Sequence, residues 1–373
     1  MNANIILCTG WGDSGKGITT DYLCNKYIKE RPIVIRFSGG PQAAHAVMVD
    51  GKMHTHSSFG SGTFRHNVPT YFSEHALIYP PNLLKEQEIL IEKTGRKPKL
   101  FIHPLAKLII PFDVINNRLD NIAKRNGTCG IGIGAAMKRH EGPHKFHAID
   151  LLNIKLLEQK LGSIYKHYVP HFSNEEVKEA IRDEMALFKV AIRNINFTLK
   201  DYNFLWGYGY LIFEGSQGIM LDMDHGLFPY VTYANTTSKN ALDVLKKMNT
   251  HNALIDTTIT YVTRCYSTLH GNNPYFRQKK INLINNENEI NVENEFQGKF
   301  KVGEVNYKAL NHAINIDTIY SNYITNVQLV VTCMDQREDF EFNYGRLKTK
   351  FDRIYNSCSP DSKDFKLIGA SNL

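Results

Sequence analysis

Cysteine is scarce in this 373-residue chain, and the six that occur never form a C-x-x-C pair. This spacing excludes a disulfide scaffold and predicts a reducing compartment. No stretch reaches the roughly 20 apolar residues that a membrane-spanning helix needs. Residues 1–10 also lack the basic segment and apolar core of a secretory leader. We therefore expect a cytoplasmic protein without a membrane partner.

Strong charge of one sign is also missing, because 44 basic residues face 37 acidic ones and the net charge is +7. Without clustered basic and aromatic segments we expect no nucleic-acid partner, and anionic small molecules are the better match to a mildly basic chain. The 42% of apolar and 22% of charged residues are typical of a globular protein and exclude collagen, global disorder and a coiled coil.

The chain contains no internal repeat and no linker long enough to separate domains. We predict a single domain over residues 1–373, with a helical subregion at about 83–200. The Asn- and Glu-rich stretch at about 281–297 predicts a polar surface insertion.

Short apolar runs that end in turn residues predict buried strands at 4–9, 33–37, 210–213 and 328–332. Helical spacing follows the first run, over residues 17–29. The pattern predicts an α/β fold with a central, mostly parallel sheet and helices on both faces. In such a sheet, ligands gather at the carboxyl ends of the strands.

A glycine loop follows the first predicted strand, because residues 10–17 read GWGDSGKG and match G-x-x-x-x-G-K. In that pattern, backbone N–H groups and a lysine bind a polyphosphate. The hydroxyl residue that usually holds Mg²⁺ after the lysine is replaced by Gly17, so Asp13 becomes the candidate to bind Mg²⁺ or act as a base. A glycine turn that binds nothing is the alternative for this loop taken alone. The predicted phosphate contacts are Gly12, Ser14, Gly15, Lys16 and Gly17.

Four segments in series resemble the adenylosuccinate synthetase family, and they read WGDSGKG, RFSGGPQAAHAVMVDGK, GTCGIGIGAA and FEGSQGIMLDMDHGLFPYVTYANTT. The resemblance covers most of the chain and weakens after about residue 270. It implies a P-loop-like GTP-binding ligase fold, a homodimer and Mg²⁺ as cofactor. It also implies a reaction in which GTP phosphorylates the 6-oxo group of IMP and L-aspartate displaces the phosphate to give adenylosuccinate.

The resemblance assigns roles to individual residues. Asp13 matches the base that takes the purine N1 proton, and it is also a metal ligand. His45 matches the histidine that stabilises charge on the transferring phosphoryl group, and Ala44 stands where a glycine carbonyl helps to bind Mg²⁺. Arg139 is the nearest candidate for an arginine that reaches across the dimer interface. Contacts to the purine monophosphate map onto Gln42, Thr128 or Cys129, Gln217 and Thr232.

The guanine-binding end of the predicted site rests on two further segments. Residues 330–335, VVTCMD, resemble the signature in which a carboxylate, here Asp335, accepts from N1–H and the 2-amino group of guanine. This favours GTP over ATP. Residues 357–361, SCSPD, resemble the loop that packs on the same base and supply Ser357 and Ser359. Taken singly, each residue has a structural alternative, such as a strand-end cap for Asp335.

Two departures from the family leave the substrates open. Ser14 replaces an acidic residue beside the purine, and the loop that binds aspartate is reduced to QGKFKVG at 297–303, with Lys299 and Lys301 as the amino-acid contacts. The chain is also short, as archaeal members of the family and the phage branch are, and the phage branch makes 2-aminoadenylosuccinate from dGMP. It therefore resembles a divergent, archaeal-like or phage member. IMP is the main prediction, and dGMP is the alternative because a hydroxyl at position 14 can accept from a 2-amino group. A GTP-binding switch without transfer chemistry is the alternative of another class.

Overall fold

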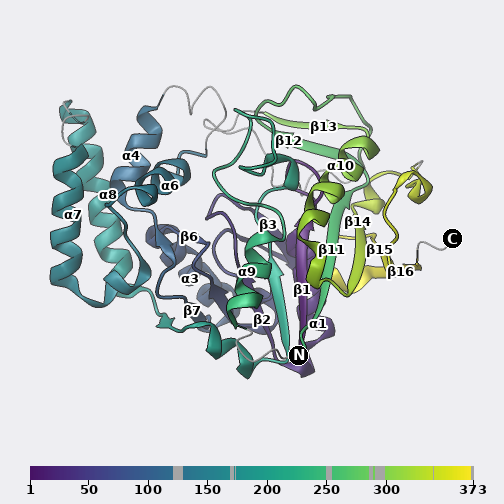
Figure 1. Ribbon diagram of the computed structural model, residues 1–373, viewed down its shortest axis with the longest axis horizontal. Helices are drawn as coiled ribbons and strands as arrows, with labels where there is room; N and C mark the ends of the chain where they lie inside the picture. The colour runs from purple at the N-terminus through teal and green to yellow at the C-terminus, as the bar shows by residue number, and fades with distance from the viewer. Residues whose placement is uncertain are drawn as a thin grey trace.

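The computed structural model describes residues 1–120, 129–168, 172, 174–248, 254–284, 289, 299–338 and 340–370. Its centre is a ten-stranded sheet with the order β16-β15-β14-β11-β1-β10-β2-β5-β7-β9 (Figure 1). Every neighbouring pair in this sheet is parallel except β15 and β16. In that order the strands span Phe365–Gly369, Arg353–Ser357, Asn326–Thr332, Asp256–Arg264, Asn2–Cys8, Tyr210–Glu214, Pro32–Arg36, Thr70–Phe72, Leu100–Ile102 and Thr198–Leu199.

Helices cover both faces of the sheet. The side chains of a strand alternate between the two faces, and in the central strands both sets are apolar, so each face needs a covering layer. In β1, Ile5 and Leu7 join the core under α9 (Lys239–Met248) and α10 (Tyr307–Asp317). Ile6, between them, joins the opposite core with Leu23 of α1 (Lys16–Lys26). The predicted α/β fold, a mostly parallel sheet with helices on both faces, is confirmed.

A second core lies beyond the short strands β5, β7 and β9, where helices dominate (Figure 1). Its apolar side chains come from short strands, from loops and from the helices α3, α4, α7 and α8, and α8 packs on both α3 and α4. The helices between residues 80 and 194 are α3 (Pro80–Thr94), α4 (Pro111–Leu119), α6 (Ile133–Glu141), α7 (Ile154–Tyr168) and α8 (Glu175–Asn194). They occupy the region that the sequence predicts to be helical.

Three small sheets lie outside the main one. The hairpin of β3 (His45–Val49) and β4 (Lys52–His56) contacts α1, and the other two pairs are β12 (Ser267–His270) with β13 (Phe300–Gly303) and β6 (Leu77–Ile78) with β8 (Lys107–Leu108). Most of the predicted polar insertion at 281–297 lies outside the described residues. Within the described ranges, none of the helices is both long and apolar enough to cross a bilayer.

Candidate active site

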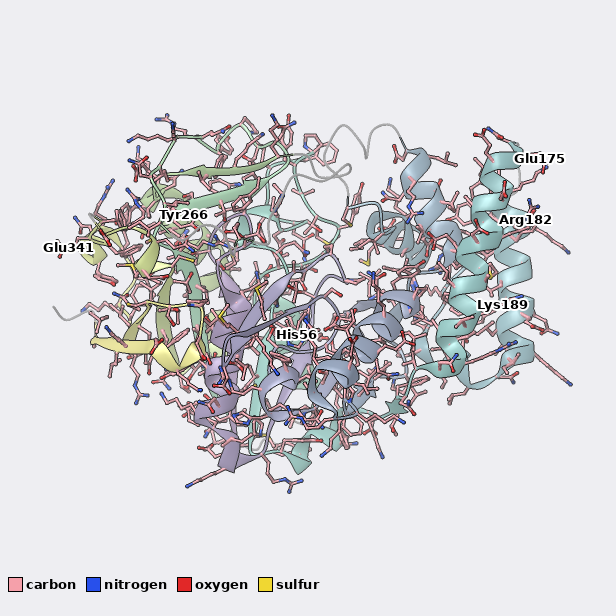
Figure 2. The ribbon with its side chains drawn as sticks, turned by 180° about the vertical axis from the view of Figure 1, so that it is seen from behind. His56, Glu175, Arg182, Lys189, Tyr266 and Glu341 are labelled. Atoms are coloured by element: carbon pink, nitrogen blue, oxygen red, sulfur yellow. The ribbon has the colours of Figure 1, made fainter. Side chains whose placement is uncertain are left out.

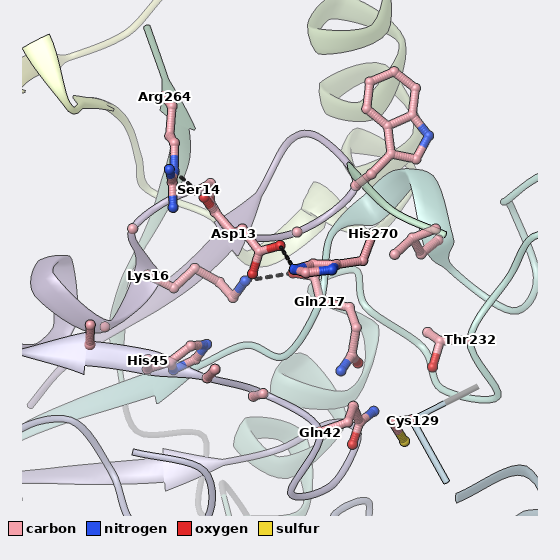
Figure 3. A pocket seen from close by; sticks show the side chains of 18 of the residues that line it. Asp13, Ser14, Lys16, Gln42, His45, Cys129, Gln217, Thr232, Arg264 and His270 are labelled. Carbon is pink, nitrogen blue, oxygen red and sulfur yellow. Dashed lines mark hydrogen bonds and ion pairs between the residues drawn. The ribbon is translucent and has the colours of Figure 1, made fainter. Parts of the chain in front are cut away.

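A cavity of about 710 Å³ opens at the carboxyl ends of the central strands (Figure 3). The glycine loop after β1 and the loops after β10 and β14 line it, and β3 and β12 add side chains from the small sheets. This is the position at which parallel α/β sheets bind ligands. Most of the predicted site residues line this cavity, namely Gly12, Asp13, Ser14, Gly15, Lys16, Gly17, Gln42, Ala44, His45, Cys129, Gln217, Thr232, Asp335, Ser357 and Ser359.

Close approach of other elements explains the glycines of the loop. Gly15 precedes α1 with φ 92°, and a Cβ there would lie 2.7 Å from a carbon of Thr332. A Cβ on Gly17 would lie 2.7 Å from the Cβ of His45. The loop is therefore pressed against both β14 and β3. Its backbone places the N-terminus of α1 on the cavity, where the helix dipole favours an anion.

Lys16 lies buried at the base of this loop, and its Nζ donates a hydrogen bond of 2.6 Å to the carbonyl oxygen of Gln217. Burial lowers the pKa of Lys16, although Cys8, Asp13 and Glu214 oppose the shift. A buried cation next to a helix N-terminus favours a polyphosphate, because the anion would replace the solvation that the ammonium has lost.

Backbone strain gathers at the same place. Asp13, Gln217 and Cys333 line the cavity with φ values of 52°, 48° and 59°, in the left-handed region that residues other than glycine rarely adopt. Such conformations persist only where the surrounding structure enforces them, and they cluster at functional sites. Asp13 is held by the guanidinium of Arg264, whose Nε donates to the Asp13 carbonyl. The Asp13 carboxylate remains 20% exposed, with Oδ2 3.5 Å from Nε2 of His270.

His45 enters the cavity from the start of β3 and is oriented by a buried carboxylate. Its Nδ1 lies 2.7 Å from Oε1 of Glu214, which is fully buried at the end of β10. The Ser61 hydroxyl and backbone N–H also donate to Glu214, and Arg36 lies 3.8 Å away. Burial lowers the pKa of His45 to about 4. The neutral ring keeps its proton on Nδ1, facing the carboxylate, so Nε2 is the nitrogen that can meet a ligand.

Several buried polar atoms on the cavity have no hydrogen-bond partner among the described residues. An unsatisfied buried donor or acceptor costs about 1–3 kcal/mol, so a group of them on one cavity points to a polar ligand. These atoms are Trp11 Nε1, Ser14 Oγ, Gln42 Nε2 and Gln217 Oε1.

The two ends of the cavity differ. Gln42, Cys129, Gln217 and Thr232 lie together on one side, and Arg264 lies on the other, beyond Asp13 (Figure 3). The loops after β14 and β15 add Asp335, Ser357 and Ser359 to the lining. Burial raises the pKa of Asp335. The sequence assigns Gln42, Cys129, Gln217 and Thr232 to the purine monophosphate, and it assigns Asp335, Ser357 and Ser359 to the guanine nucleotide.

Three predicted residues within the described ranges, Arg139, Lys299 and Lys301, are absent from the cavity lining. Arg139 is buried, with two nitrogens bound to Asp113 at 2.9 and 2.7 Å and others bound to backbone carbonyls. All three guanidinium nitrogens of Arg139 therefore bond within the chain, and its contact with a partner subunit stays a prediction. Lys301 donates to Gly271 and Asn272, Lys299 is exposed, and neither contributes to the lining. Thr128 lies outside the described residues.

Sequence reasoning missed three functional candidates, namely Glu214, Arg264 and His270. Glu214 sits inside the segment FEGSQG, so the motif contained it, but nothing local indicated that its carboxylate would meet a histidine 169 positions away. Arg264 ends β11 and His270 ends β12. Neither β11 nor β12 is among the predicted strands, so the signal that could have found these two residues, a charged side chain at the carboxyl end of a strand, required predicting those strands first.

The donor groups of the cavity fit Mg²⁺. This ion prefers oxygen ligands and retains several waters. The partly exposed carboxylate of Asp13 lies beside the phosphate loop, and Ala44 lines the same wall, so its carbonyl is the second donor that the sequence predicts.

A mostly parallel sheet with a glycine loop at the start of α1 and this cavity defines an α/β nucleotide-binding protein. The chain belongs to the adenylosuccinate synthetase family, because the family model of adenylosuccinate synthetase matches residues 5–336. Among curated relatives, the adenylosuccinate synthetase of Tolumonas auensis is 31% identical over 248 residues, which are 63% of this chain and 56% of the relative. That of Chlorobaculum parvum is 33% identical over 256 residues, 64% and 57% of the two chains. The alignments thus span little more than half the length of these relatives.

Two solved structures share the fold. The fully ligated adenylosuccinate synthetase of Plasmodium falciparum has a TM-score of 0.73 at 17% identity, over 98% of this chain and all of that one. The succinoaminodeoxyadenylate synthetase of cyanophage S-2L, bound to dGMP and dATP, has a TM-score of 0.64 at 17% identity, over 98% and 95% of the two chains.

Proposed function

We propose that this protein is a GTP-dependent ligase that phosphorylates the 6-oxo group of IMP and joins L-aspartate to give adenylosuccinate, GDP and phosphate. The observation that carries the proposal is the convergence of Asp13, Lys16 and His45 on one cavity. Asp13 and Lys16 come from the glycine loop and His45 from β3, and together they would supply a base, a phosphate-binding cation and a donor to a phosphoryl oxygen. The proposal includes a homodimer and a cytoplasmic location, both of which stay predictions.

The carboxylate of Asp13 is the base of the proposed reaction. A purine 6-oxo group becomes a better nucleophile toward phosphorus when N1 loses its proton, and a carboxylate on the cavity wall can accept that proton. The hydrogen bond from Arg264 holds the backbone of Asp13, so the carboxylate is positioned before substrate binds. Mg²⁺, held by Asp13 and the Ala44 carbonyl, would supply a positive charge to the terminal phosphates.

Lys16, the N–H groups of the glycine loop and His45 would stabilise charge on the transferring phosphoryl group. Phosphoryl transfer needs mainly positioning and electrostatic stabilisation. Nδ1–H of His45 donates to Glu214, which directs Nε2 to the cavity. Nε2 donates to a phosphoryl oxygen when the ring carries its second proton, and the charges of Glu214 and of the bound phosphates would favour that protonated form. Asp335, in the loop after β14, would accept from the guanine edge and so select GTP.

A second acceptor, dGMP, is favoured by one observation. The hydroxyl of Ser14 is 3% exposed, lies on the cavity and lacks a hydrogen-bond partner within the described ranges. A 2-amino group on the purine would supply the missing donor. The cyanophage protein of the same fold binds dGMP.

Phosphate release measured with GTP, Mg²⁺ and L-aspartate tests the proposed reaction. We expect release that requires a purine monophosphate and is faster with IMP than with dGMP. Strict dependence on dGMP would replace the first acceptor by the second. Release that ignores both monophosphates would reject the ligase and favour a GTP-binding switch.

Asp13→Ala tests the base. We expect turnover to fall by about 10²–10⁴-fold, because both proton removal and metal binding lose their carboxylate. Asp13→Asn, which keeps the shape of the side chain, should lose nearly as much. Turnover within a few-fold of the wild type in the Asn variant would assign the base elsewhere.

A further inference from the structure

Three metal-capable side chains meet away from the cavity, between β4 and α3. His54 and His56 belong to β4 and Glu86 to α3, and their exposed fractions are 2%, 0% and 4%. One ligand atom from each lies within 4.8 Å of the other two. Figure 2 labels His56, which lies in the middle of the molecule.

Glu86 presents its two oxygens differently. Oε2 accepts from the backbone N–H groups of Ser57 and Ser58 and from the Ser57 hydroxyl, at 3.0, 2.6 and 2.9 Å. Oε1 faces both imidazoles, with Nδ1 of His56 at 3.1 Å and Nε2 of His54 at 3.7 Å, and otherwise accepts only from the N–H of Phe59 at 3.2 Å. One oxygen therefore fixes the carboxylate while the other is directed at the two histidines, as in metal sites whose ligands are held by outer hydrogen bonds.

Hydrogen bonds among the described residues do not compensate for the burial of the His54 ring. Neither of its ring nitrogens has a hydrogen-bond partner among the described residues, and Nε2 of His56 has none either. The contact of 3.7 Å to Glu86 is too long for a hydrogen bond. A fully buried imidazole without partners is costly and requires an explanation, such as an ion.

The two separations from Glu86 Oε1 suit a small transition-metal ion, and the two imidazole nitrogens lie within 4.8 Å of each other. Ligands bound at 2.0–2.1 Å in a tetrahedral arrangement lie about 3.3 Å apart, and the two distances to Glu86 Oε1 fall on either side of that value. Two imidazole nitrogens and a carboxylate oxygen are typical Zn²⁺ ligands, whereas Mg²⁺ favours oxygen alone.

We propose that His54, His56 and Glu86 form a structural site for a divalent transition metal of the zinc class, which ties β4 to α3. The inference does not depend on the proposed reaction. It would also support the cavity indirectly, because β4 pairs with β3 and His56 lies directly opposite His45 in that hairpin.

A second group of metal-capable residues provides a matched control. Glu74, His75 and Asp243 also lie within 4.8 Å of one another but are only partly buried. Lys247 donates to Glu74 at 2.7 Å and to Asp243 at 2.8 Å, so a cation of the chain already occupies this cluster. We expect no metal there.

The test uses the full chain, stripped with a chelator, dialysed and titrated with Zn²⁺ alone, and it measures bound zinc and the melting temperature. We expect one tightly bound zinc per chain and a rise in melting temperature. His54→Phe, which places an aromatic ring next to Phe64, should lose both, with zinc affinity lowered at least 10-fold, and His75→Phe should keep both. Equal zinc binding by wild type and His54→Phe would overturn the site, as would a wild type that binds none.

Cobalt substitution in the wild type keeps the inference testable if His54→Phe does not fold. Co²⁺ in a site with nitrogen and oxygen ligands should give a visible d–d absorption that one equivalent of Zn²⁺ abolishes. Absence of that absorption overturns the site. None of these measurements uses turnover, so an inactive protein with bound zinc would reject the proposed reaction and leave the metal site standing.

Discussion

The β3–β4 hairpin carries two buried histidine–carboxylate pairs on directly opposite residues, and the two pairs have different surroundings. His45 contacts Glu214 at 2.7 Å and lines the cavity. His56, its cross-strand partner, contacts Glu86 at 3.1 Å and faces the helical region. The chemistry of the two pairs is the same, but of these two histidines His45 lines the cavity and His56 does not. The role of a histidine–carboxylate pair therefore depends on what faces the second ring nitrogen of the histidine.

Removing the carboxylate on the helical side should have the largest effect on stability. Glu86→Ala leaves the backbone N–H groups of residues 57–59 and Nδ1 of His56 without their acceptor. We expect the free energy of unfolding to fall by about 3–5 kcal/mol, because a fully buried charge network loses one partner. Urea unfolding measures this loss. A change below 1 kcal/mol would contradict the structural role of the pair.

Removing the histidine on the cavity side should affect catalysis instead. For His45→Ala we expect turnover to fall by about 10²–10³-fold, as for the loss of one transition-state donor, with GTP binding nearly unchanged. Steady-state kinetics and the melting temperature separate the two effects. Equal kinetic losses in His45→Ala and His56→Ala, each corrected for folded fraction, would remove the distinction between the two sides of the hairpin.

The carboxylate on the cavity side positions His45 and does not itself line the cavity. We expect Glu214→Ala to lower turnover by about 10–100-fold, the range found for partners that orient a functional histidine. Glu214→Gln retains an oxygen that accepts from Nδ1–H, and it should recover part of the loss. The fall should appear in kcat and not in KM, and a rise in KM alone would assign Glu214 to substrate binding.

The smallest expected effect is that of a substitution outside both histidine–carboxylate pairs, and it serves as a reference for the larger effects. Asp335→Asn changes the predicted guanine contact on the cavity lining, and we expect the KM for GTP to rise about 10-fold because a hydrogen bond to a charged group is weakened. Affinity for the monophosphate and the melting temperature should stay the same. Unchanged GTP kinetics would remove Asp335 from base recognition.

Much of the fold was predictable because it depends on local pattern. The apolar runs at 4–9, 33–37, 210–213 and 328–332 correspond to β1, β2, β10 and β14, and the glycine loop lies between β1 and α1 as predicted. The same locality explains why the loop residues and His45 are found on the cavity. The contacts of Arg139 were not predictable from local pattern. Its ion pair with Asp113 depends on how α4 and α6 pack, which no short motif encodes.

Short motifs and hydrophobic periodicity in the chain were sufficient for four strands of the main sheet, for the glycine loop and for the family, since each depends on residues close together along the backbone. The packed structure alone brought Glu214 to His45 and Arg264 to Asp13, and it set His54 beside Glu86. These contacts join segments that are 32 to 251 positions apart, or they depend on which face of a strand turns inward. Periodicity cannot specify such pairings, because many partners of the same type are available until the elements pack.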